Sequence, residues 1–215
     1  MAKNEKYVPA LSFDSLTFLY DPIVRWTTRE NEFKTKLVEQ ANVQAEQKVL
    51  DVGCGTATLT IALKKSCPEA AVHGLDGDGK ILSIARKKIQ RENVEVFLEQ
   101  GFSNSLPYES GSFDCVVSSL FFHHLTPENK KETLREIWRV LKPNGDLHIA
   151  DWGKPQNLLM VLLSKPIEWL DGATVKDSFQ GLLAGYLAET NFDAVRETAR
   201  FNTFFGTNRL LRAKK

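Results

Sequence analysis

The 215-residue chain carries almost no excess charge of either sign. Lysine and arginine together number 28, aspartate and glutamate number 27, and the formal net charge is +1. A nearly neutral chain produces no long-range field that would attract nucleic acid or anionic lipid. We therefore expect a small-molecule partner and no nucleic acid.

Cysteine is scarce as well, and long apolar runs are missing. Cys54, Cys67 and Cys115 show neither metal-ligand spacing nor a paired framework, which is typical of a reducing intracellular setting. No stretch approaches the roughly 18 apolar residues that a membrane span needs, and residues 1–9 are too polar for a signal segment. The sequence predicts a soluble, cytoplasmic protein with no membrane span.

What the chain does contain is a regular alternation of strand and helix patterns within a 42% hydrophobic composition, enough for the core of one domain. The expected strands cover 48–52, 70–75, 94–98, 113–119 and 146–150, and the expected helices cover 57–66, 79–91 and 127–141. Strands joined by helices pair in parallel and form a doubly wound α/β sheet. Ligands of such a sheet bind beyond the carboxyl ends of its strands.

Both ends of the chain add to this pattern. Residues 1–45 are expected to form a helical N-terminal cap within the same domain, and residues 46–215 the ligand-binding part. Residues 157–163 are interpreted as a buried helix, with a lid or a dimer contact as alternatives. A helix near 177–190 and strands at 194–203 and 204–212 complete the chain.

A glycine-containing turn after the first strand marks a ligand site. Gly53 and Gly55 allow a sharp turn and close approach of the backbone to a ligand, and the following helix points its unpaired N–H groups at the same place. Asp76 ends the second strand, where its carboxylate can accept hydrogen bonds from both hydroxyls of a ribose. Asp78 is the better candidate for the N-cap of the next helix. The turn and Asp76 together indicate an adenosine-containing ligand.

NAD and S-adenosylmethionine share this geometry. The dinucleotide fingerprint has a third glycine, used for close packing of helix and strand, where this chain has Thr58. A methionine-derived ligand has no pyrophosphate to seat on the helix. S-adenosylmethionine is therefore favoured, and an NAD-dependent oxidoreductase is the alternative.

At these residues the chain resembles the class I S-adenosylmethionine-dependent methyltransferases, in the small-molecule branch that includes the ubiquinone and menaquinone methyltransferases. The resemblance covers about residues 20–152 and rests on the segments 49–56, 74–76, 106–117 and 139–147. It implies a three-layer Rossmann-like fold, with a mixed seven-stranded sheet whose last strand is antiparallel. It also implies S-adenosylmethionine as cofactor and S-adenosylhomocysteine as product.

The family pattern assigns a part of the cofactor to individual residues. By this resemblance the methionine part lies near Asp51, Gly53 and Gly55, the ribose near Asp76, and the adenine near Gly77 and Ile81. Ser118 and Ser119, at the end of the fourth strand, become cofactor neighbours.

The adenine contact is the point at which this chain departs from the family pattern. Phe102 stands where the family often has an acidic residue. A backbone contact or Ser103 could replace the missing acceptor, and Phe102 could stack on the adenine. A core phenylalanine is the equally weighted alternative.

For the methyl acceptor, two histidines follow the fourth strand. In-line displacement mainly requires alignment and exclusion of water, but an acceptor that loses a proton needs a base, for which imidazole is suited. His123 is the candidate base or positioning residue, and the family pattern favours His124 for a structural hydrogen bond. Two adjacent histidines supply too few ligands for a metal, so none is expected. Tyr20, His123 and Trp152 are the candidate acceptor pocket, with core packing as the alternative for the aromatic side chains.

The sequence thus predicts a methyltransferase that uses S-adenosylmethionine and acts on a small molecule, as a monomer or homodimer. A non-catalytic subunit that binds the cofactor is the remaining alternative. The acceptor and its reacting atom are not specified by the sequence.

Overall fold

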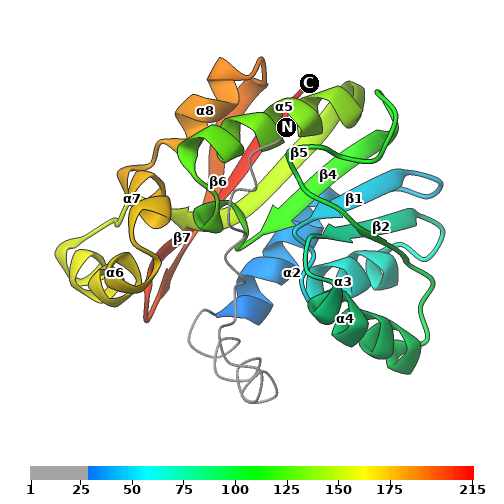
Figure 1. Cartoon of the computed structure of the whole chain (residues 1–215), viewed down its shortest axis with the longest axis horizontal. Helices are drawn as coiled ribbons and strands as arrows, with labels where there is room; N and C mark the ends of the chain where they lie inside the picture. Colours follow the sequence, from blue (N-terminus) through cyan, green and yellow to red (C-terminus); the bar gives the residue numbers. More distant parts are fainter. Residues whose placement is uncertain (1–28) are drawn as a thin grey trace, which may run out of the picture.

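The computed structural model describes residues 29–215, which form one seven-stranded sheet with helices on both faces (Figure 1). The strand order is β3-β2-β1-β4-β5-β7-β6. The strands are β1 (Lys48–Val52), β2 (Ala71–Asp76), β3 (Phe97–Gln100), β4 (Phe113–Ser119), β5 (Leu141–Gly153), β6 (Asp193–Thr203) and β7 (Gly206–Lys214).

The pairing of the strands confirms the predicted mixed sheet. β1, β2, β3, β4 and β5 pair in parallel, whereas β7 is antiparallel to both β5 and β6. The order reverses between β1 and β4, which start the two halves of the sheet. In a doubly wound sheet the crevice at this reversal is where a ligand binds.

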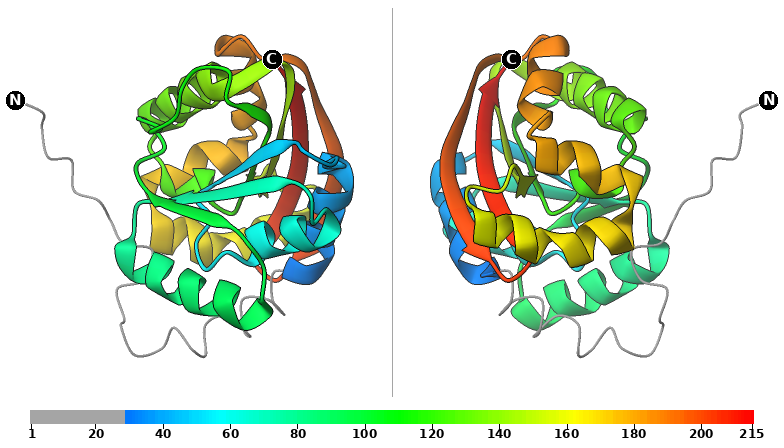
Figure 2. Two further views of the ribbon diagram at one scale, coloured as in Figure 1. Left: turned by 90° about the vertical axis from the view of Figure 1, so that its right-hand side faces the viewer. Right: turned by 90° about the vertical axis from the view of Figure 1, so that its left-hand side faces the viewer.

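Helices cover the two faces and form the outer layers of a three-layer fold (Figures 1 and 2). The helical elements are α2 (Glu30–Ala41), α3 (Thr58–Ser66), α4 (Gly79–Glu92), the 3₁₀ turn η1 (Phe122–His124), α5 (Pro127–Val140), α6 (Leu158–Asp171), α7 (Ala173–Gln180) and α8 (Leu183–Glu189). One core cluster joins α2 and α3 to the sheet, and another joins α5 and α8 to the opposite face. The predicted three-layer α/β architecture is confirmed.

Several expected elements have different bounds. β3 begins at Phe97, three residues after the expected start. β5 runs from Leu141 to Gly153, beyond both expected ends, and its pairing with β4 is irregular between Leu141 and Asp146. The single helix expected near 177–190 is split into α7 and α8 at Gly181, whose φ of 77° ends α7 in the left-handed region.

The interpretation of residues 157–163 as a buried helix is wrong in part. The segment begins α6, but Leu158, Leu159 and Leu162 are 81%, 60% and 64% exposed, and only Met160 of this stretch is buried. Within residues 29–215, no helix combines the length and the apolar character needed to cross a membrane. Tyr20 and most of the predicted N-terminal cap lie outside the described residues, and α2 is the part of the cap that the structure describes.

Candidate cofactor and acceptor site

The glycine turn joins β1 to α3 at the carboxyl edge of the sheet. Gly53 and Gly55 both have positive φ, 71° and 54°, in the region that favours glycine. The N–H groups of Gly53 and Cys54 donate to the carbonyl of Leu75, at 2.8 and 3.0 Å. A Cβ atom placed on Gly55 would meet nothing within 4 Å. The turn is therefore held against β2 on one side and open at Gly55.

Asp76 connects this turn to the start of the next helix. Its Oδ2 accepts from the N–H of Gly55 at 2.9 Å, and its Oδ1 accepts from the N–H of Asp78, also at 2.9 Å. Burial raises the pKa of Asp76 from its ordinary value. Each carboxylate oxygen retains a second lone pair that can accept from a ligand hydroxyl. The side chain of Asp78 caps α4, as the sequence predicts.

Asp51 provides a second carboxylate, deeper in the sheet. It lies in β1 and is 1% exposed. Its Oδ2 accepts from the hydroxyl of Thr60 at 2.7 Å, while Oδ1 has no hydrogen-bond partner among residues 29–215. Burial raises the pKa of Asp51 to about 6. A buried oxygen without a partner next to an open turn fits a ligand that brings a positively charged donor.

The expected adenine side is formed where the β2–α4 connection meets the end of β3. A Cβ on Gly77 would lie 3.4 Å from the ring of Phe102, so this ring lies alongside the Gly77 backbone. Phe102 is 59% exposed, which contradicts the alternative that it is a core residue. The amide of Gln100 donates to the carbonyl of Gly77 at 3.2 Å, and Ile81 is half-buried nearby in α4. Contact of Phe102, Gly77 and Ile81 with an adenine stays a prediction.

Two of the three predicted serines use their hydroxyls in hydrogen bonds within the protein. The Ser103 hydroxyl bonds to that of Thr133 in α5 at 2.7 Å, and the Ser118 hydroxyl donates to the carbonyl of Val52 at 2.8 Å. Both residues are buried, whereas Ser119 is half-buried. Ser103 and Ser118 therefore join neighbouring elements, and contact of any of the three with the cofactor stays a prediction.

On the acceptor side, the structure pairs His123 with a residue that the sequence did not single out. His123 Nδ1 lies 2.7 Å from Oδ1 of Asp151 at the end of β5, and both residues are buried. Burial alone would raise the pKa of Asp151, but His123 and the N–H of Trp152 hold that pKa below its ordinary value. An ionised carboxylate only accepts, so Nδ1 carries the proton and Nε2 is left as the basic nitrogen.

Asp151 also fixes the backbone of the turn that carries His123. Its Oδ2 accepts from the N–H groups of Phe121 and His123, at 3.1 and 3.3 Å. His124 is exposed, and the surrounding protein atoms and the adjacent His123 lower its pKa. The buried side-chain hydrogen bond at this turn is made by His123, and the structural role expected of His124 stays a prediction.

Trp152 follows Asp151 and is 5% exposed. Its ring is edge-on to the ring of His123, with 6.2 Å between centroids. The structure thus brings together two of the three predicted pocket residues. The signal that could have revealed Asp151 is its position before Trp152, at the end of a strand that leads to the ligand edge.

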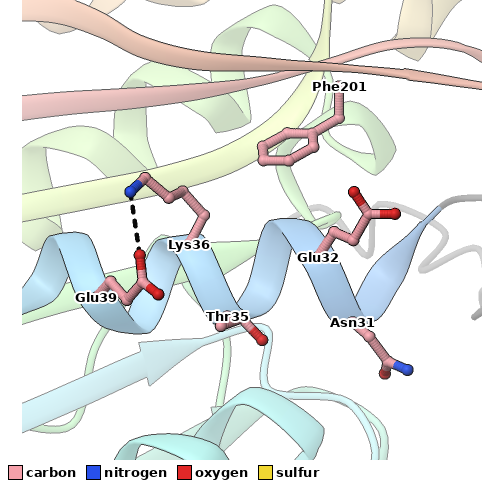
Figure 3. Close-up of a pocket in the computed structure, with 6 residues that line it drawn as sticks. All are labelled: Asn31, Glu32, Thr35, Lys36, Glu39 and Phe201. Atoms are coloured by element: carbon pink, nitrogen blue, oxygen red, sulfur yellow. Dashed lines mark hydrogen bonds and ion pairs between the residues drawn. The ribbon is translucent and has the colours of Figure 1, made fainter.

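A groove beside α2 lies apart from the predicted site. A groove of about 420 Å³ lies between α2 and Phe201 of β6, lined also by Asn31, Glu32, Thr35, Lys36 and Glu39 (Figure 3). None of these residues belongs to the predicted site, and Lys36 and Glu39 pair with each other. Between residues 29 and 215, no group of three or more His, Cys, Asp or Glu could hold a metal ion.

This chain is similar to proteins that are named as methyltransferases. A family model described as a methyltransferase domain matches residues 49–145. A demethylmenaquinone methyltransferase of Lactobacillus johnsonii is 38% identical over 136 residues, which cover 62% of this chain and 55% of that protein. The chain spans about half the length of the curated demethylmenaquinone methyltransferases that it matches.

Two further similarities cover more of the chain. An uncharacterised methyltransferase of Synechocystis is 30% identical over 172 residues, which cover 80% of this chain and 74% of that protein. The crystal structure of the YcgJ protein of Bacillus subtilis has a TM-score of 0.73 at 19% identity, covering 86% of this chain and 98% of that one. A structure from Aquifex aeolicus described as a SAM-dependent methyltransferase has a TM-score of 0.64, also at 19% identity, covering 84% and 88%. The chain belongs to the class I S-adenosylmethionine-dependent methyltransferase family.

Proposed function

We propose that this chain transfers a methyl group from S-adenosylmethionine to a small-molecule acceptor by in-line displacement. The observation that carries the proposal is the meeting of Asp51, Gly55 and Asp76 at one turn, with Asp51 Oδ1 buried and unpartnered among the described residues. The similarity to methyltransferases over this region supports the same activity.

The residues at the turn match the parts of this cofactor. Asp51 would accept from the ammonium group of the methionine part, and Asp76 would accept from the ribose hydroxyls. Gly77 and Phe102 would border the adenine. When bound, S-adenosylmethionine supplies a methyl group activated by its sulfonium centre.

On the acceptor side, His123 and Trp152 would position the reacting atom and exclude water. His123 Nε2 would accept the proton that the acceptor loses, and Asp151 would stabilise the imidazolium that results. We propose a reduced aromatic quinone as the acceptor class, supported by the similarity to proteins named demethylmenaquinone methyltransferases. We also propose a cytoplasmic location, which the free, buried state of Cys54, Cys67 and Cys115 supports.

The test has two parts, cofactor binding and methyl transfer. Titration calorimetry with S-adenosylhomocysteine should show binding, and mass spectrometry should show one added methyl group on reduced demethylmenaquinone after incubation with S-adenosylmethionine and the full chain. Binding of NADH in place of S-adenosylhomocysteine would support the oxidoreductase alternative. Cofactor binding without transfer to any metabolite, together with one copurifying partner, would support the non-catalytic subunit.

A further inference from the structure

Asn208 in β7 is a fully buried amide that the proposed chemistry does not use. Its side chain is 0% exposed, and neither Oδ1 nor Nδ2 has a hydrogen-bond partner among residues 29–215. An amide can donate two hydrogen bonds and accept two, all of which it makes to water in the unfolded chain. An amide that is buried without a partner loses these hydrogen bonds, so its presence in a folded protein needs an explanation.

The strand register places Asn208 at the ligand edge of the sheet. Asn208 is directly opposite Trp152 of β5 and Phe201 of β6. Directly opposed side chains of antiparallel strands project from the same face, so the amide lies beside the Trp152 side chain. Trp152 is the second-last residue of β5, at the carboxyl end where ligands bind.

The neighbours of this position connect it to the acceptor side. The Trp152 ring lies against the His123 ring. Two residues before Asn208, a Cβ on Gly206 would lie 3.3 Å from Ser164 of α6 and 3.6 Å from Phe179 of α7. These two helices therefore cover the end of β7 that carries Asn208. The amide shares a face with Trp152 and Phe201 and is fully buried near the edge of the sheet where β5 ends.

We propose that Asn208 is a specificity-determining residue that hydrogen-bonds an oxygen of the methyl acceptor. Nδ2 donates to a carbonyl or phenolate oxygen, and Oδ1 accepts from a hydroxyl, so the site selects an acceptor with an oxygen substituent on its ring. A leucine of similar size would fill the same space without leaving polar atoms unpaired. The inference rests on the proposed function, because the acceptor it selects is the one that receives the methyl group.

The experiment compares the wild type with Asn208→Leu, in the full chain and with S-adenosylhomocysteine titrated first. The probe is reduced demethylmenaquinone with a short isoprenoid tail. It is used for the KM of methyl transfer and for the thermal shift that it causes in protein saturated with S-adenosylhomocysteine. The control is Asn202→Leu, the same substitution on the adjacent strand, where the side chain is half-buried and bonded to Gln156.

The expected result is that Asn208→Leu raises the KM of the probe by at least about tenfold and abolishes its thermal shift. Affinity for S-adenosylhomocysteine stays within about twofold of the wild type, and the ligand-free melting temperature does not fall, because no protein hydrogen bond is lost. Asn202→Leu leaves the KM unchanged. This combination separates recognition of the acceptor from a structural role.

Three results would overturn the inference. The first is an unchanged KM and thermal shift in Asn208→Leu. The second is a lower ligand-free melting temperature with parallel loss of both ligands, which would make Asn208 a structural residue bonded to a buried water. The third is failure of the probe to bind wild-type protein saturated with S-adenosylhomocysteine. Failure of S-adenosylhomocysteine itself to bind is a different outcome, which would remove the proposed function together with this inference.

Discussion

Replacing Asp51 with asparagine should stabilise the ligand-free protein at neutral pH and lower its affinity for the cofactor. The Asp51 carboxyl is buried with one oxygen unpartnered among residues 29–215, and its pKa is raised from 3.8 to about 6. The folded state therefore binds this proton more tightly than the unfolded state. The contribution of Asp51 to stability is most favourable below about pH 4 and is lost as the pH rises through about 6.

The size of the effect follows from the shift in pKa. About two pKa units at 1.36 kcal/mol each give an upper value of about 3 kcal/mol for the cost of the ionised carboxylate above pH 6. The neutral amide of the Asp51→Asn variant would carry no such cost, and its oxygen could still accept from Thr60. For a chain of this length, Asp51→Asn should raise the melting temperature at pH 8 by on the order of 5–10 °C, and by almost nothing at pH 4.

The assay is thermal unfolding of wild type and variant between pH 4 and 8, followed by titration with S-adenosylhomocysteine over the same range. A ligand ammonium beside Asp51 favours its ionised form, so wild-type affinity should rise with pH through about 6, and the variant should show no such rise. Asp114→Asn is the control. The Lys142 ammonium holds the pKa of Asp114 below its ordinary value against the effect of partial burial, so this substitution should destabilise the protein at pH 8. Equal stability of wild type and Asp51→Asn across this range would refute the reasoning.

Three other predictions test the remaining parts of the site. Asp76→Ala removes two charge-assisted acceptors of ribose hydroxyls and should weaken S-adenosylhomocysteine binding by about 2–4 kcal/mol in calorimetry, and unchanged affinity would exclude Asp76 from the ribose site. Asp151→Asn should lower kcat with little change in S-adenosylhomocysteine affinity, because the variant no longer fixes the tautomer of His123. A pH–rate profile identical to that of the wild type would contradict this role of Asp151. Gly53→Ala should destabilise the fold more than Gly55→Ala in urea unfolding. A Cβ at Gly53 would lie 2.3 Å from the ring of Phe121, whereas a Cβ at Gly55 would meet nothing within 4 Å. The reverse order of stability would be inconsistent with this geometry.

Much of the fold could be predicted because its signals are local. Hydrophobic period and turn residues place β1, β2 and β4 within one residue of their observed bounds, and Pro127 and Asp78 mark helix starts. The exposure of α6 could not be predicted in this way. An apolar run is compatible with burial or with an exposed face, and the choice depends on which elements pack over it, which local sequence does not contain.

The site likewise contains residues that local sequence predicts and residues that it does not. Gly53 and Gly55 follow β1 and Asp76 ends β2, so their meeting is implied by the βαβ pattern itself. Asp151 and Asn208 are different, because each acquires its role from a residue on another strand or turn. The pairing of Asp151 with His123 spans 28 positions, and Asn208 meets Trp152 only through the antiparallel register of β5 and β7. Those partners depend on strand order, which the sequence pattern leaves open.

The same strand order joins the glycine turn after β1 to the proposed acceptor side. Leu120 leaves β4 with a φ of 51°, and Phe121 follows with its ring against Gly53 of the turn. The N–H of Phe121 donates to Asp151, whose other oxygen holds His123. A change in the glycine turn therefore acts on Phe121 first, and through Asp151 on the orientation of His123. For this reason substitutions at Gly53 should alter kcat as well as cofactor affinity, whereas substitutions at Phe102, on the adenine side, should alter affinity alone.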